Sequence, residues 1–87
     1  MAFFERTGTK SFDPPTPMRG YLSQLNEWSL GTITWDVLRI GGADHMPTFE
    51  AVPILNGERL ETFASIGPSK KTAMEEAAAR MALSGHC

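Results

Sequence analysis

The sequence has one cysteine and no long hydrophobic run. Cys87 cannot form an intrachain disulfide, and with only His86 beside it the ligand set of a zinc site is incomplete. No apolar stretch approaches the about 20 residues that cross a membrane, and residues 1–10 lack the apolar segment of a secretory signal. We therefore expect a soluble intracellular protein, in the cytoplasm or the nucleus, with no metal, no other cofactor and no membrane contact.

The chain also lacks the patterns that support catalysis. It has no Gly-rich nucleotide loop, no nucleophile triad and no cluster of metal ligands. Glu75 and Glu76 are neighbours on a predicted helix and would point about 100° apart, so they would not converge on one substrate. We expect a binding protein rather than an enzyme.

Basic residues are few as well. Lys and Arg total 8 against 10 for Asp and Glu, which gives a net charge of −2, whereas nucleic-acid-binding domains usually have a basic excess. The sum lowers the expected non-specific affinity for nucleic acid, but local contacts depend on where the charges lie. With 87 residues, 41% of them hydrophobic, the chain suffices for one small domain.

The N-terminal part divides into an arm and a helix. Residues 1–17 show no hydrophobic period and include several prolines, so we expect a flexible arm there and a folded domain over 18–85. Apolar residues then recur at the spacing of an amphipathic helix that begins after Pro17 and ends near Gly31. They are Met18, Tyr21, Leu22, Leu25 and Trp28.

Three strands are expected in the middle of the chain. Residues 32–40, 48–55 and 58–66 are rich in β-branched, aromatic and aliphatic side chains, and 41–47 is predicted to be a loop. Asn56-Gly57 is the preferred pair for a two-residue type I′ turn between the second and third strands. Pro53 cannot donate to a strand ladder, so we expect a local break in pairing there.

A second helix follows over residues 72–83, with Ser69 as its N-cap. Its apolar face is mostly alanine, which allows close packing against a sheet or another helix. The predicted fold class is α+β, in the order α-β-β-β-α. Lys70 and Lys71 stand where this helix begins, and free N–H groups with a positive dipole end attract phosphate there. The chain is therefore predicted to contact nucleic acid.

Three motifs in this order resemble the double-stranded RNA-binding domain family, over about residues 18–84. They are Leu22-Ser-Gln-Leu-Asn-Glu27, Gly42-Ala-Asp-His-Met-Pro-Thr-Phe49 and Lys70-Lys-Thr-Ala-Met-Glu-Glu-Ala-Ala78. The resemblance implies a three-stranded antiparallel sheet with both helices packed on one face. It also implies recognition of A-form duplex by shape, through 2′-hydroxyls and phosphates spread over about 16 base pairs.

The resemblance assigns a role to each part of the surface. The first helix would contact one minor groove, the loop between the first two strands the next minor groove, and the start of the second helix the phosphates between them. The residues implied are Ser23, Gln24 and Glu27, then His45 and Pro47, then Ser69, Lys70 and Lys71.

Some positions depart from the family pattern. Met74 stands where the family has a third lysine, and Asp44 precedes the expected histidine. These departures leave a second interpretation open, in which the same fold binds itself or a partner protein and binds RNA weakly or not at all. Trp35 is either part of the sheet core or part of an exposed patch on the helix-free side of the sheet.

Overall fold

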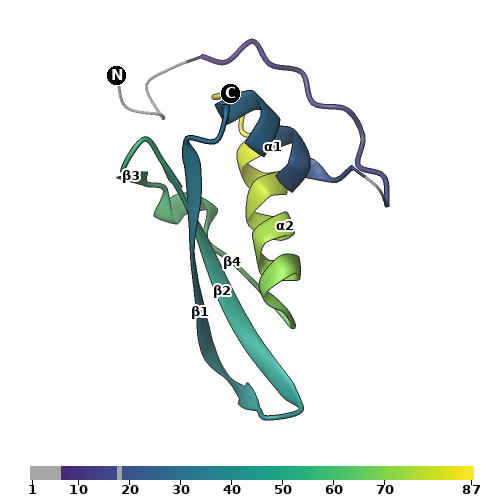
Figure 1. Cartoon of the computed structure of the whole chain (residues 1–87), viewed down its shortest axis with the longest axis vertical. Helices are drawn as coiled ribbons and strands as arrows, with labels where there is room; N and C mark the ends of the chain where they lie inside the picture. Colours follow the sequence, from purple (N-terminus) through teal and green to yellow (C-terminus); the bar gives the residue numbers. More distant parts are fainter. Residues whose placement is uncertain (1–6, 18) are drawn as a thin grey trace.

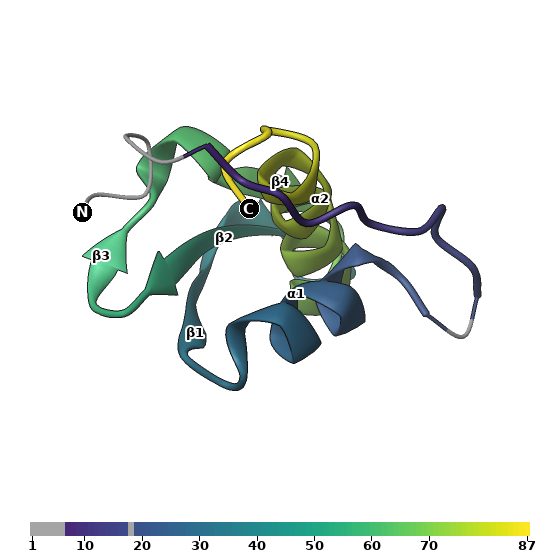
Figure 2. The same cartoon turned by 90° about the horizontal axis from the view of Figure 1, so that it is seen from above.

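A computed structural model describes residues 7–17 and 19–87. It confirms an α+β fold in the order α-β-β-β-α, with the third strand in two pieces. The elements are α1 (Tyr21–Ser29), β1 (Ile33–Ala43), β2 (Met46–Leu55), β3 (Glu58–Arg59), the 3-10 helix η2 (Glu61–Phe63), β4 (Ser65–Gly67) and α2 (Lys70–Ala82). Both helices lie on one side of the antiparallel sheet (Figures 1 and 2).

Strand β2 is the centre of the sheet. It pairs with β1 along one edge, and with β3 and then β4 along the other. The β1–β2 hairpin is long and projects past the start of α2, so its tip lies at the opposite end of the molecule from α1 (Figure 1). The molecule measures 41 × 28 × 19 Å along its principal axes.

The predicted loop over 41–47 is wrong, because both strands continue through most of it. Gly42 pairs with Pro47 and Ala43 with Met46, which leaves Asp44 and His45 as the turn. A bulge after Arg39 accommodates the extra residue in β1. Gly42 has φ +86°, and a Cβ there would meet the Met46 carbonyl oxygen at 2.2 Å, so this position requires glycine.

The third strand is interrupted opposite Pro53, as predicted. The Pro53 carbonyl accepts the Leu60 N–H at 2.9 Å, so the backbone of Pro53 faces the third strand. Proline has no N–H to return to that strand. The chain therefore leaves the ladder after β3, forms η2 and rejoins β2 opposite Ala51.

The predicted type I′ turn is also confirmed. Asn56 and Gly57 have φ values of +51° and +83°, the left-handed pair that this turn requires. Helix α1 begins later than predicted, at Tyr21, after a cap residue, Gly20, that has no side chain to accept a hydrogen bond. Met18, the predicted first residue, lies outside the described residues.

Helix α2 packs on the sheet through very small side chains. Ser69 is its N-cap and accepts the Thr72 N–H at 3.1 Å, as predicted. The buried face consists of Ala73, Ala77, Ala78, Met81 and Ala82.

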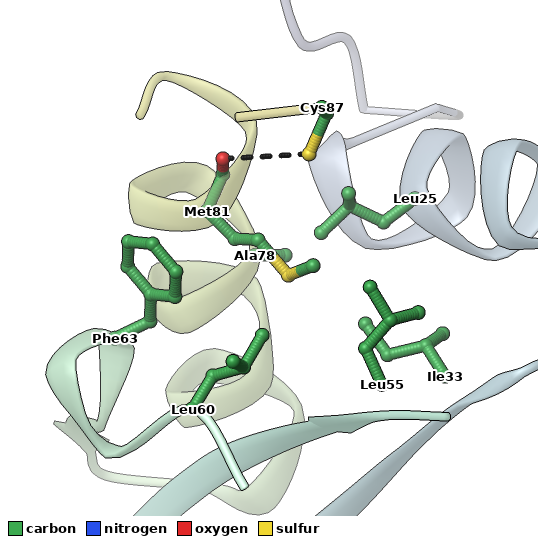
Figure 3. Close-up of a cluster of buried hydrophobic side chains, with 8 residues drawn as sticks. All are labelled: Leu25, Ile33, Leu55, Leu60, Phe63, Ala78, Met81 and Cys87. Atoms are coloured by element: carbon green, nitrogen blue, oxygen red, sulfur yellow. Dashed lines mark hydrogen bonds between the residues drawn. The ribbon is translucent and has the colours of Figure 1, made fainter. Parts of the chain in front are cut away.

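The core lies between the helices and the sheet (Figure 3). It takes residues from both helices, from β1, β2 and η2, and from the segments that follow β3 and α2: Leu25, Ile33, Leu55, Leu60, Phe63, Ala78, Met81 and Cys87. Trp35 packs against this cluster, which favours the first of its two predicted positions. The Cys87 thiol points at the Met81 carbonyl at 3.6 Å, so the C-terminal residue is held inside the fold.

The described part of the N-terminal arm runs along the domain. The Gly8 N–H donates to the Gly85 carbonyl at 2.9 Å, and Phe12 packs against the core cluster. These contacts lay the arm over the C-terminal tail. The predicted flexibility of the arm stays a prediction.

Candidate nucleic-acid interface

Two lysines stand at the start of α2. Lys70 and Lys71 are both exposed, and no ion pair joins either of them to another described residue. The first N–H groups of a helix have no intrahelical partner, and Ser69 satisfies the one at Thr72. The Ser69 hydroxyl also lies 2.9 Å from the Thr72 hydroxyl, so Ser69 orients the helix start on which both lysines stand.

Helix α1 brings two polar side chains next to this helix start. Ser23 and Asn26 line a hollow of about 330 Å³ together with Lys71 and Glu75 of α2. Ser23 and Asn26 are three residues apart, so they share one helix face. Asn26 was not among the residues predicted for the site, although its spacing from Ser23 could have indicated it.

Gln24 is not part of this surface. Its side chain is 2% exposed, although a contact with RNA was predicted for it. Its amide NH₂ donates to the Asp13 carbonyl at 3.0 Å, and its amide oxygen accepts the Asp13 N–H at 2.8 Å. A buried amide needs such partners, so in this structure Gln24 holds the arm and does not face solvent.

Glu27 is exposed but already forms an ion pair. Its carboxylate forms an ion pair with Arg19, and Arg19 also lies 4.0 Å from the Asp13 carboxylate. The carboxylate predicted to accept a hydrogen bond from a 2′-hydroxyl therefore already has a partner within the chain.

The hairpin tip holds the other predicted residues. His45 is exposed in the turn, and Pro47 is half-buried at the start of β2. Asp44 lies 3.5 Å from the Arg39 guanidinium, which offsets part of its charge. Along the long axis the order is α1, the start of α2 and then the hairpin tip (Figure 1).

Most described arginines are paired with carboxylates. Arg19, Arg39 and Arg59 each form at least one ion pair. A side-chain hydrogen bond to Asp36, and a second to Glu61, raise the pKa of Arg59 above its ordinary value. Among the described cations, those on α2 form no ion pair with a described residue: Lys70, Lys71 and Arg80.

Glu75 connects the two helices. Its carboxylate accepts the Leu22 N–H of α1 at 3.3 Å and lies against Gly20, where a Cβ would meet it at 2.7 Å. Gly20 supplies no capping side chain, so α2 provides the cap and the negative charge that a helix N-terminus favours. Glu75 therefore helps to set where Ser23 and Asn26 stand relative to Lys71.

Other kinds of site find no support in the described part of the chain. No group of three or more His, Cys, Asp or Glu side chains is arranged to hold a metal ion among residues 7–17 and 19–87. None of the described helices is both long enough and apolar enough to cross a bilayer.

No protein-family model, curated protein or solved structure matches this chain. The three motifs that resemble the double-stranded RNA-binding domain, and the placement of their residues in the fold, are therefore what a functional assignment depends on.

The cap supplied by Glu75 predicts a specific pattern of stability. Glu75→Ala should lower the free energy of unfolding by about 1 kcal/mol, the usual cost of losing an N-cap. Glu75→Gln should lower the free energy of unfolding by less, because the amide oxygen can still accept a hydrogen bond from the Leu22 N–H. Urea denaturation would measure both, with Glu76→Ala as the control, since Glu76 is exposed on the same helix. Equal stability of the Glu75→Ala and Glu76→Ala variants would contradict the cap.

Proposed function

We propose that this protein binds double-stranded RNA by the shape of the A-form duplex and has no catalytic activity. The observation that carries the proposal is the start of α2, where Lys70 and Lys71 form no ion pair with a described residue and Lys71 shares a hollow with Ser23 and Asn26. This arrangement puts hydroxyl, amide and ammonium groups from two helices at one place on the surface.

The chemistry of these groups suits an RNA backbone. Two ammonium groups and the N–H groups of a helix start favour phosphate oxygens. Hydroxyl and amide groups such as those of Ser23 and Asn26 can exchange hydrogen bonds with 2′-hydroxyls, which line the wide minor groove of an A-form helix. RNA therefore suits this surface better than DNA, which has no 2′-hydroxyl.

The hairpin tip supplies a second contact in this proposal. His45 is exposed at the end of a long hairpin, and its imidazole can donate to a 2′-hydroxyl in a neighbouring minor groove. Contacts to sugar and phosphate carry little base specificity.

We place the protein in the cytoplasm or the nucleus, where such duplexes occur.

The net charge of −2 does not oppose this assignment strongly. Ion pairs with arginine offset the charge of several carboxylates, among them Asp36, Glu27 and Asp44. Lys70 and Lys71 form no such pair with a described residue, so their charge can attract phosphate at the helix start. Few phosphate contacts are involved, about two to four, and affinity should therefore fall with salt on a shallow logarithmic slope of roughly −2 to −4.

A duplex titration tests the proposal. An RNA duplex of about 20 base pairs, long enough for the about 16 that such a surface spans, should bind more tightly than the DNA duplex of the same sequence at low salt. Fluorescence anisotropy would give both dissociation constants. Equal affinity for the two duplexes, or no binding to either, would overturn the assignment.

The two lysines should dominate the affinity. Lys70→Ala and Lys71→Ala together should weaken RNA binding by about tenfold or more at low salt and reduce the salt slope by about two, because two phosphate contacts are lost. Arg80→Ala is the matched control: Arg80 is exposed in the last turn of α2 and also forms no ion pair with a described residue. A folded double variant that binds as well as the Arg80 variant would contradict the role of the helix start.

A second candidate function is binding to a partner protein or to a second copy of this chain. Leu38, Glu50 and Ile66 lie side by side across three strands, on the face opposite buried Ala51. Leu38 is 54% and Ile66 59% exposed, so the helix-free side of the sheet presents apolar surface around Glu50.

Sedimentation with and without duplex RNA separates the two candidates. The RNA-binding proposal predicts a monomer whose mass increases only when RNA is added. A dimer that is unaffected by RNA, and that Leu38→Lys converts to a monomer, would favour the sheet surface instead.

A further inference from the structure

Residues 13–17 and Arg19 form a turn beside α1 that hydrogen bonds between Thr16 and Arg19 close, here called the 13–19 turn; Met18 within this range lies outside the described residues. The Thr16 N–H donates to the Arg19 carbonyl at 3.0 Å. In return, the Arg19 N–H donates to the Thr16 carbonyl at 3.2 Å and to the Thr16 hydroxyl at 3.0 Å. Pro14, Pro15 and Pro17 restrict its backbone further. The turn therefore has a defined shape of its own.

Helix α1 holds this turn at both ends. At its start, the backbone N–H and carbonyl of Asp13 bond to the buried Gln24 amide at 2.8 and 3.0 Å. At its end, the Arg19 guanidinium pairs with Glu27. The two anchors lie three residues apart on α1, so the turn is fastened along the helix that carries Ser23 and Asn26.

The turn also borders the candidate RNA surface. Pro15, Thr16 and Pro17 line the same hollow of about 330 Å³ as Ser23 and Lys71. All three are exposed. A sugar or phosphate that enters this hollow must therefore fit beside the turn or move it.

The turn offers RNA almost no attraction. Its three prolines have no N–H to donate to phosphate, and its one cation, Arg19, is already paired with Glu27 and lies near Asp13. The Asp13 side chain is 77% exposed and adds a negative charge. Steric and electrostatic effects both oppose RNA at this place.

We propose that the 13–19 turn is an intramolecular cover for the α1 part of the RNA-binding surface, and that its displacement raises affinity for duplex RNA. The inference rests on the proposed function. The turn and the duplex compete for Glu27 and for access to the hollow. When only a fraction of the molecules is uncovered, the apparent dissociation constant is the intrinsic value divided by that fraction.

A pair of substitutions in the full chain tests this cover. Asp13→Pro removes both the carboxylate and the N–H that binds the Gln24 amide oxygen, whereas Asp13→Ala removes the carboxylate alone. The proline variant should bind a duplex RNA of about 20 base pairs at least about fivefold more tightly than the alanine variant, a typical size for such coupling. Thermal melting confirms that both variants fold.

A second pair of substitutions tests the cover without any change of charge. It loosens the arm at a site that is remote from α1. A Cβ at Gly8 would lie 1.9 Å from the Cys87 carbonyl carbon, so Gly8→Val forces the arm away from the C-terminal tail. Thr9→Val is the matched control, because Thr9 is exposed. The Gly8 variant should bind RNA more tightly than the Thr9 variant.

Each outcome decides between the two proposals. Binding of RNA by the unmodified chain, with tighter binding by each loosened variant than by its matched control, supports the cover. Equal or weaker binding by the loosened variants, while the unmodified chain binds RNA, overturns the cover and leaves the proposed function standing. Absence of binding by every variant overturns both.

Discussion

The close packing of α2 on the sheet is the constraint on which the rest of the structure depends. Ala73, Ala77 and Ala78 are completely buried, and their methyl groups let the helix approach the strands closely. Gly67 makes this approach feasible at the start of the helix, since a Cβ there would meet the Ala73 nitrogen at 2.9 Å. Because this packing fixes the helix on the sheet, it also fixes where the helix start with Lys70 and Lys71 lies.

Two polar side chains join parts of the chain that are far apart in sequence. Glu75 of α2 caps α1 at the Leu22 N–H, and Gln24 of α1 binds the backbone of Asp13 in the arm. Glu75 thereby contributes to the geometry of the surface, because its hydrogen bond to the Leu22 N–H joins the start of α1 to α2.

The sequence predicted the elements well where local chemistry decides them. Asn56 and Gly57 form the expected type I′ turn, and the missing N–H of Pro53 interrupts the third strand as expected. It failed over 41–47, because Gly42 and Asp44 are typical of loops and only pairing with β2 keeps this segment in a hairpin. It also placed Gln24 on the surface, since a polar side chain on a helix is normally solvated.

The amino-acid sequence by itself therefore determined the order of the elements, the capped start of α2 and the position of its two lysines, because these follow from residues close together in the chain. Only the tertiary structure decided which polar groups share the hollow, that Glu75 caps α1, and that the 13–19 turn binds the Gln24 amide and the Glu27 carboxylate. The reason is physical: whether a polar side chain faces solvent or finds a partner depends on which distant segments pack beside it, and local sequence carries no record of that.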